Sequence, residues 1–171
     1  MPADPRHIIV TPRGRPRNPW STDEVAWPDY CCAMLIDAEG RYVFERRSAK
    51  ATSAPGQLAC FGGKREPMEH PDRCIRREIK EELGWSVGAL RLIVAVRLRE
   101  RATGREIAWF YRGSAPRASL ALKPLPGSSI LHLNAKDLLA APDLSDWHRA
   151  AIVAAEANEA IAWIESPIIA R

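Results

Sequence analysis

The chain has 171 residues, of which 46% are hydrophobic, and its formal net charge is +4. A chain of this length and composition is large enough for one globular domain with a real core. No apolar run approaches the ~18 residues of a membrane-spanning helix, which excludes an integral helical membrane protein. The modest positive charge favours anionic ligands.

The chain divides into two unequal parts. Residues 1–25 are rich in proline and arginine, so we expect them to be irregular, and they do not resemble a signal peptide. Residues 26–171 show no internal repeat and no second linker, so we expect a single domain. Cytoplasmic location is the default expectation for such a chain.

The pattern of turns and apolar residues predicts alternating strands and helices. The expected strands are residues 30–36, 41–46, 58–61, 90–98, 106–112 and 130–133. A turn at residues 102–104 would join two of them as a hairpin. The expected helices are 71–83, a short one from a cap at Asn134 to Leu139, and a last one from Asp143 or Ser145 to about Ile164.

The helix at 71–83 has clear boundaries. Pro71 suits the first helical position, because its missing N–H would be unpaired there anyway. Gly84 is a natural stop just past the last turn. At about 100° per residue, three acids share one arc of the helix and an apolar stripe lies beside it. The acids are Glu78, Glu81 and Glu82, and the stripe is Ile75, Ile79 and Leu83.

These acids belong to a longer motif that starts before the helix. Its fixed positions are Gly63, Glu69, Arg77-Glu78-Ile79, Glu81-Glu82 and Gly84-Trp85. Like charges three and four residues apart repel each other unless a cation lies between them, and hard carboxylate oxygens suit Mg²⁺ or Mn²⁺. A surface helix would show part of this pattern by chance. The whole pattern would arise in a chain of this length on the order of once in ten million.

Residues 63–85 resemble a complete Nudix box, the signature of the Nudix hydrolase superfamily. Trp85 is bulkier than the aliphatic residue usual at that position. The resemblance implies an α/β/α sandwich with a mixed β-sheet, in which the box forms a loop-helix-loop. It also implies an enzyme that hydrolyses a phosphorus anhydride bond in a nucleoside diphosphate linked to another group.

The resemblance assigns roles to residues of the box. The metal ligands would be the carbonyl of Gly62 and the carboxylates of Glu78, Glu81 and Glu82. Arg77 and Glu69 would orient the catalytic carboxylates, and either Glu78 or Glu81 would activate the attacking water. The expected cofactor is Mg²⁺, with Mn²⁺ as the alternative.

Other charged residues are weaker candidates. The substrate phosphates are expected to meet cations that bracket the box, namely Arg46, Arg47, Lys64 and Arg65. Many triphosphate-hydrolysing relatives carry a further glutamate before the strand that here begins near Ile130, but residues 121–129 contain no acid. The nearest substitutes are Glu100 and Glu106, near the expected hairpin, with Asp137 and Asp143 as outside candidates. Trp109, Phe110 and Tyr111 alternate along a strand, which leaves open whether one of them stacks on a base.

Cysteines and histidines give no further signal at this stage. The four cysteines, Cys31, Cys32, Cys60 and Cys74, have no Cys-x-x-Cys spacing, so they indicate neither a metal site nor a disulfide framework. We interpret them as small core residues. His148 has no metal-like partner near it in the sequence.

The sequence indicates a class of substrates but no single substrate. Marks of ADP-ribose, diadenosine polyphosphate and coenzyme A hydrolases are absent or incomplete, which leaves an NTP, a dNTP or a related nucleotide derivative. The alternative is a non-catalytic module of the same fold that binds a nucleotide or an RNA end and regulates. Intact box carboxylates favour the enzyme. We expect no membrane partner. We expect no nucleic-acid partner other than an RNA 5′ end. A homodimer agrees with the resemblance.

Overall fold

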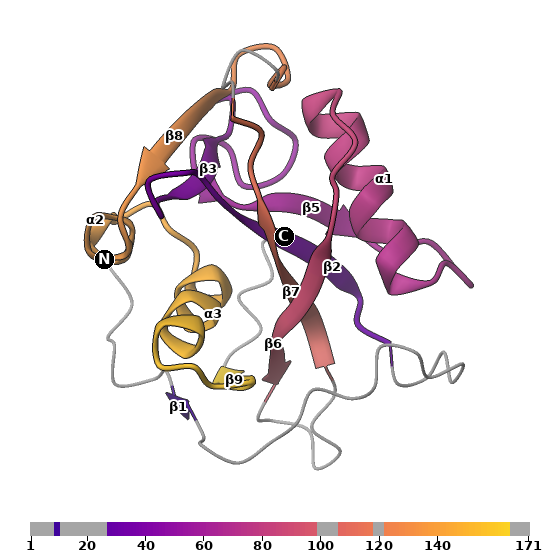
Figure 1. Cartoon of the computed structure of the whole chain (residues 1–171), viewed down its shortest axis with the longest axis vertical. Coiled ribbons are helices and arrows are strands. Elements are labelled where there is room, and N and C mark those ends of the chain that lie inside the picture. The colour runs from indigo at the N-terminus through magenta and orange to yellow at the C-terminus, as the bar shows by residue number, and fades with distance from the viewer. Residues whose placement is uncertain (1–8, 11–26, 99–105, 118–121, 165–171) are drawn as a thin grey trace.

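The computed structural model describes residues 9–10, 27–98, 106–117 and 122–164 (Figure 1). The strands are β1 (Ile9–Val10), β2 (Tyr30–Ile36), β3 (Tyr42–Arg46), β4 (Leu58–Ala59), β5 (Phe61–Lys64), β6 (Leu90–Leu98), β7 (Glu106–Ser114), β8 (Ser129–Leu133) and β9 (Ile161–Ile164). The helices are α1 (Pro71–Leu83), α2 (Ala135–Ala140) and α3 (Asp146–Glu156). None of the described helices is long and apolar enough to span a membrane.

The strands form one mixed sheet in the order β1-β9-β6-β7-β2-β3-β4, with β5 paired to β2 and β8 paired to β3. The pairs β2–β7 and β6–β9 are parallel, and the other strand pairs are antiparallel. Neighbouring residues of β2 point to opposite faces of the sheet, as in any strand. The strand therefore contributes side chains to two separate cores.

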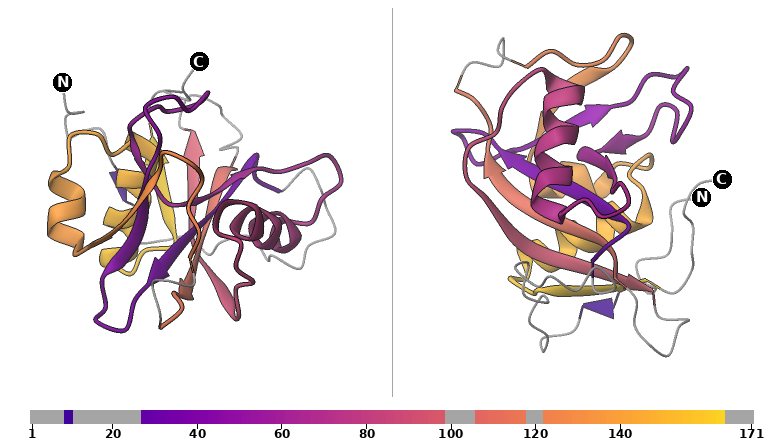
Figure 2. Two further views of the ribbon diagram at one scale, coloured as in Figure 1. Left: turned by 90° about the horizontal axis from the view of Figure 1, so that it is seen from above. Right: turned by 90° about the vertical axis from the view of Figure 1, so that its right-hand side faces the viewer.

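The helices cover both faces of the sheet. Figure 2 shows α1 on one side and α2 and α3 on the other. The α1 side holds a cluster of buried side chains that includes Cys31, Phe61 and Trp109, and the α3 side holds another that includes Cys32, Phe44 and Phe110. The expected α/β/α sandwich with a mixed sheet is confirmed.

The last helix is shorter than expected. We predict a helix to about Ile164, but α3 ends at Glu156 and the chain continues into β9. Asn158 has a left-handed backbone (φ 57°), which ends the helix. After it, Ile161–Ile164 pairs with β6 and adds its apolar side chains to the sheet. The prediction failed because helix and strand periods are hard to separate in a short apolar run.

Other boundaries differ by small amounts. Ile9–Val10 forms β1 and pairs with β9, although residues 1–25 are expected to be irregular. The expected strand at 58–61 is split into β4 and β5, and β7 extends two residues beyond 112. The expected hairpin turn at 102–104 lies outside the described residues.

Helix α1 has the expected boundaries, Pro71 and Leu83. The ring nitrogen Nδ1 of His70 accepts from the backbone N–H of Asp72 and so caps the first turn. Gly84 takes the left-handed conformation at the other end (φ 63°). The apolar stripe of Ile75, Ile79 and Leu83 is fully buried, so the carboxylates beside it are held at the edge of the helix contact.

Gly62 fixes the distance between β5 and β2. Its φ is +142°, a conformation that favours glycine, and a Cβ there would lie 2.1 Å from the carbonyl oxygen of Cys31 and 2.7 Å from the Cα of Cys32. Because both contacts are to backbone, no side-chain rotation can relieve them. The segment that leads into α1 can pack this closely only with glycine at position 62.

We expect Gly62→Ala to lower the free energy of unfolding by at least about 3 kcal/mol, since it adds a backbone clash to backbone strain. Urea unfolding followed by circular dichroism measures the change. Gly40→Ala is the matched control, because Gly40 also has a positive φ (+79°) but nothing lies within 4 Å of its Cβ position. We expect it to cost about 1 kcal/mol. Equal losses in the two variants would contradict the close approach.

Candidate functional site

A cleft of about 890 Å³ runs between the box and the start of α3. Gly62 and the box residues Glu78 and Glu82 line it on the α1 side, and Trp147 and His148 of α3 line it on the other. Its size is typical of pockets for small molecules. The box motif therefore faces a space that can hold a nucleotide-sized ligand.

Arg77 is bonded to three acids of the box. Its Nε and Nη2 donate to the two oxygens of Glu69, each at 2.9 Å, in the paired geometry that guanidinium and carboxylate favour. Its Nη1 donates to Glu78 at 2.7 Å and to Glu81 at 3.2 Å. The loop before α1 is tied to the helix through this one side chain.

The Arg77 contact sets the charge of Glu69. The guanidinium, helped by a hydrogen bond from the backbone N–H of Glu66, lowers the pKa of Glu69 from 4.5 to about 2 despite burial, which acts the other way. The same interaction raises the pKa of Arg77. Both groups are therefore charged throughout the neutral range.

Glu82 is in the opposite situation. One of its oxygens accepts from the backbone N–H of Gly62 at 2.8 Å, but burial raises its pKa from 4.5 to about 8. The charges of Glu45 and Glu78 raise it further, against the opposing effect of Arg47. Burial also raises the pKa of Glu78. These carboxylates lie in an environment with too little positive charge.

Glu45 of β3 is a site residue that the sequence analysis missed. Only 2% of it is exposed, and its carboxylate lies 3.8 Å from Nη1 of Arg47, which is also 4.0 Å from Glu82. An acid among the apolar residues of a strand is uncommon, and this feature of the sequence could have marked Glu45 as a candidate. The sequence alone does not reveal that β3 brings Glu45 beside the box helix.

The donor atoms fit a divalent cation. Carboxylate oxygens from one helix edge converge near the backbone of Gly62, and hard oxygen donors suit Mg²⁺ or Mn²⁺ rather than a soft metal. Burial is the main cause of the raised pKa values of Glu78 and Glu82, and the neighbouring carboxylates add to it. A bound dication would supply the missing positive charge.

The four expected phosphate-binding cations take different places. Arg47 and Lys64 line the cleft. Arg46 pairs with Asp143, and it is not among the cleft-lining residues. Arg65 donates to the carbonyls of Pro28, Glu66 and Glu69 and lies over the Trp27 ring at 5.3 Å. Arg47 and Lys64 are thus the two that can reach a ligand in the cleft.

The outside candidates for a further acid lie elsewhere. Asp143 forms an ion pair with Arg46, and the carboxylate of Asp137 accepts a hydrogen bond from the side chain of Asn134, the N-cap of α2. Glu100 lies outside the described residues, as does the side chain of Glu106. The aromatic residues of β7, Trp109, Phe110 and Tyr111, are all buried, so base stacking by any of them has no support.

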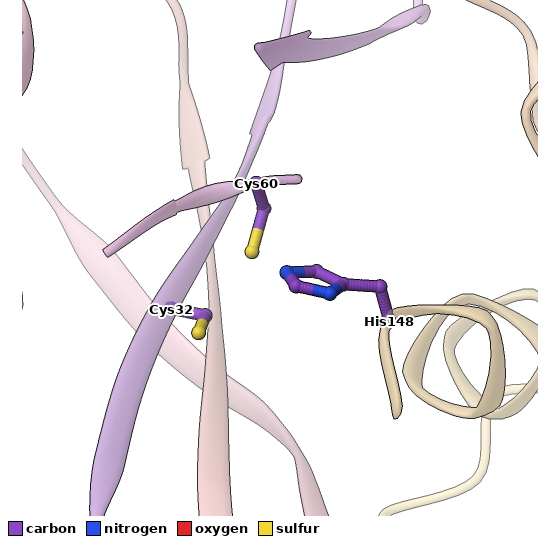
Figure 3. A group of neighbouring side chains, drawn as sticks. All are labelled: Cys32, Cys60 and His148. Atoms are coloured by element: carbon purple, nitrogen blue, oxygen red, sulfur yellow. The ribbon is translucent and has the colours of Figure 1, made fainter. Parts of the chain in front are cut away.

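The fold also brings together two cysteines and a histidine that belong to no common sequence motif. Cys32, Cys60 and His148 place their ligand atoms within 4.8 Å of one another, and all three are buried (Figure 3). The sequence analysis indicated no metal site among the cysteines, because these residues come from β2, the β4–β5 junction and α3. All four cysteines are free and buried, as expected of core residues.

Comparison with known proteins identifies the family. The NUDIX domain family matches residues 27–149, which include the whole box and both sides of the cleft. The chain belongs to this family.

A curated relative matches part of the chain. It is the nucleoside triphosphatase NudI of Klebsiella pneumoniae (strain 342), 46% identical over 50 residues. The match covers 29% of this chain and 36% of that protein, so the chain spans about a third of the length of the relative it matches.

Solved structures share the fold. The MutT protein from Methanosarcina mazei Go1 has a TM-score of 0.62 at 19% identity, over 78% of this chain and 96% of that one. The MutT NUDIX hydrolase from Burkholderia pseudomallei has a TM-score of 0.57 at 24% identity, over 74% and 97%. The NUDIX domain of Shewanella oneidensis NrtR, solved with ADP ribose, has a TM-score of 0.56 at 17% identity, over 75% and 85%. At these identities the likeness shows the fold alone.

We expect the metal-free protein to lose stability as the pH rises from 4.5 to 8. In that window the folded chain keeps a proton on Glu82, whose folded pKa is about 8, and the unfolded chain, with a pKa near 4.5, has released it. Unfolding therefore releases a proton, and a higher pH favours it. Thermal unfolding in EDTA across this range measures the loss. Glu82→Gln should flatten the profile, and an equally steep decline in that variant would contradict the assignment.

We expect Glu69→Gln to lower the free energy of unfolding by about 1.5–3 kcal/mol at pH 7, since it breaks a paired hydrogen bond to a charged group. The depressed pKa of Glu69 stabilises the fold above pH 4.5, and this contribution fades as the pH falls through about 2. Urea unfolding at pH 7 and pH 3 measures the difference from wild type, which should shrink at the lower pH. Glu66→Gln, in the same loop but exposed, is the control and should change little.

Proposed function

We propose that this protein is a Mg²⁺-dependent pyrophosphohydrolase that cleaves a nucleoside diphosphate-linked substrate. The observation that carries the proposal is that Glu78, Glu82 and Gly62 line the same cleft, where Arg77 holds Glu78 and the Gly62 N–H holds Glu82. A phosphate chain in the cleft would lie against these groups.

Each residue of the box has a distinct task in this proposal. Glu78, Glu81 and Glu82, with the Gly62 carbonyl, hold the cation. Glu69 acts on Arg77, and Arg77 fixes the rotamer of Glu78, which is what keeps the carboxylates together despite their repulsion. The cation, when bound, would polarise a phosphoryl group of the substrate and activate a water. Glu78 or Glu81 takes the proton of that water.

The three carboxylates of the helix differ in how exposed they are to solvent, and this suggests different roles for them. The side chain of Glu81 is 58% exposed, whereas those of Glu78 and Glu82 are 14% and 11% exposed. Glu81 can therefore pass a proton to solvent most easily, and Glu78 and Glu82 are the more firmly fixed ligands. Glu45 adds negative charge beside Glu82 and strengthens the attraction for a dication.

Other residues that line the cleft could bind the remaining parts of a nucleotide. Arg47 and Lys64 lie where they can meet phosphate oxygens. On the α3 side, Ser145, Asp146 and Trp147 offer a hydroxyl, a carboxylate and an indole to a nucleoside. The NudI relative acts on nucleoside triphosphates by its name, which supports an NTP or dNTP as the first substrates to test.

The alternative, a nucleotide-binding module without catalysis, would use the same cleft. Its only specific support is the NrtR domain, which was solved with ADP ribose. The complete set of box carboxylates favours the enzyme. The two functions differ in turnover, so one assay separates them.

The test is phosphate and pyrophosphate release from a panel of NTPs, dNTPs, ADP-ribose, NADH, diadenosine polyphosphates and coenzyme A, with Mg²⁺ or Mn²⁺. We expect metal-dependent turnover of at least one nucleotide. Glu82→Gln should reduce kcat at least about 100-fold, because it removes a charged ligand of the cation. Glu39→Gln, an exposed acid that pairs with Arg41, is the control and should keep wild-type turnover.

If no nucleotide in the panel is turned over, calorimetry should be used to measure whether any of them binds. Binding without release of phosphate from any member of the panel would favour the regulatory module. Turnover that is equal in wild type and Glu82→Gln would contradict the assignment of the site.

A further inference from the structure

The cluster of Cys32, Cys60 and His148 has the composition of a soft-metal site. Two thiols and an imidazole are common ligands of structural and catalytic zinc, and three protein ligands with an open fourth position are usual in catalytic sites. All three residues are nearly inaccessible, with exposed fractions of 3%, 4% and 5%. They come from three separate parts of the fold, so their meeting is not a result of sequence proximity.

The geometry needs little adjustment to hold an ion. Tetrahedral zinc with Zn–S near 2.3 Å and Zn–N near 2.0–2.1 Å places its ligand atoms about 3.6–3.8 Å apart. Here the three ligand atoms lie within 4.8 Å of one another. In Figure 3 the imidazole of His148 reaches from α3 toward the sulfur atoms of Cys32 and Cys60. Closing the cluster onto an ion takes shifts of about 1 Å or less.

His148 is held by a partner of the kind that metal-bound histidines have. Its Nδ1 lies 2.5 Å from the hydroxyl oxygen of Ser145. With the Nδ1–H donated to that oxygen, the lone pair of Nε2 is left for a metal, and such outer partners fix the tautomer of a ligating imidazole. Edge-to-face packing against Trp147, Phe110 and Phe44 fixes the plane of the ring.

Charge balance favours a dication at this place. The hydrogen bond with the Cys60 thiol and burial raise the pKa of Cys32, so without a metal the Cys32 thiol stays protonated. A dication that displaces one proton from each thiol to solvent gives two thiolates and a neutral imidazole around it, with no net charge. A neutral assembly is the form that a buried site tolerates best.

We propose that Cys32, Cys60 and His148 form a second metal site, specific for Zn²⁺ or a similarly soft cation. It is distinct from the carboxylate site in residues and in donor chemistry, because Mg²⁺ prefers oxygen ligands. All three residues line the cleft, so the fourth coordination position is open to water or to a ligand in the cleft. The site also joins α3 to β2 and the β4–β5 junction. The proposal does not depend on the hydrolase activity.

The experiment is a titration of the reduced, EDTA-treated and desalted full-length chain with Co²⁺, in the presence of excess Mg²⁺ to fill the carboxylate site. We expect a near-ultraviolet thiolate-to-cobalt band that saturates at about one equivalent per chain. Zn²⁺ should bleach this band, and competition with a zinc indicator then gives the affinity. Only cysteine ligands produce such a band, so ions bound by carboxylates are not counted.

The variants assign the band to its residues. Cys32→Ala and Cys60→Ala should abolish it, and His148→Phe, which keeps the aromatic packing, should weaken Zn²⁺ binding at least about tenfold. Cys31→Ala is the matched control. Cys31 is adjacent and equally buried but belongs to the core on the α1 side, so the band should be unchanged.

Two results would overturn the proposal. One is a wild-type chain with reduced thiols that shows no thiolate-to-cobalt band, a measurement that does not require any variant to fold. The other is a band that Cys31→Ala removes as completely as Cys60→Ala, with circular dichroism showing that both variants are folded. In either case the three residues are core side chains and not metal ligands.

Discussion

The contact between Arg77 and Glu69 is the constraint on which the carboxylate site depends. Glu78, Glu81 and Glu82 repel one another along one edge of α1, and burial of Glu82 adds to the free energy of keeping them charged. A guanidinium that is fixed in direction by Glu69 holds two of these acids by hydrogen bonds. The loop and the helix are therefore a single unit, which agrees with a motif that begins before the helix and extends from Gly63 to Trp85.

Local features were predictable from the sequence because they depend on short-range physics. Pro71 and Gly84 mark α1 at its two ends, and the buried stripe of Ile75, Ile79 and Leu83 follows from the helical period. The sandwich was available only through the resemblance to a family, and the strand order was not predicted. The final helix was overextended, since Ile161–Ile164 has apolar residues compatible with either a helix or a strand.

Residues that meet through the tertiary fold were not predictable. Glu45 comes beside Glu82 because β3 lies next to the segment that leads into the box, and no spacing rule reports that. Cys32, Cys60 and His148 are in the same position, since they belong to no local motif. Arg46 and Arg47 are adjacent, yet Arg46 at the end of β3 pairs with Asp143, and Arg47 just after the strand lines the cleft. How close a basic residue is to the box in the sequence therefore does not decide whether its side chain lines the cleft.

The parallel pairing of β2 with β7 has a consequence for how the chain folds. Tyr30 lies opposite Ala108, and the whole box lies between them in the sequence. Loop-closure entropy must be overcome before a pairing of such long range forms, so chains with this topology fold slowly. Helix α1 can form early as a local element, but β2 receives its β7 neighbour only late. A nascent chain therefore carries the complete motif for some time before it has a cleft.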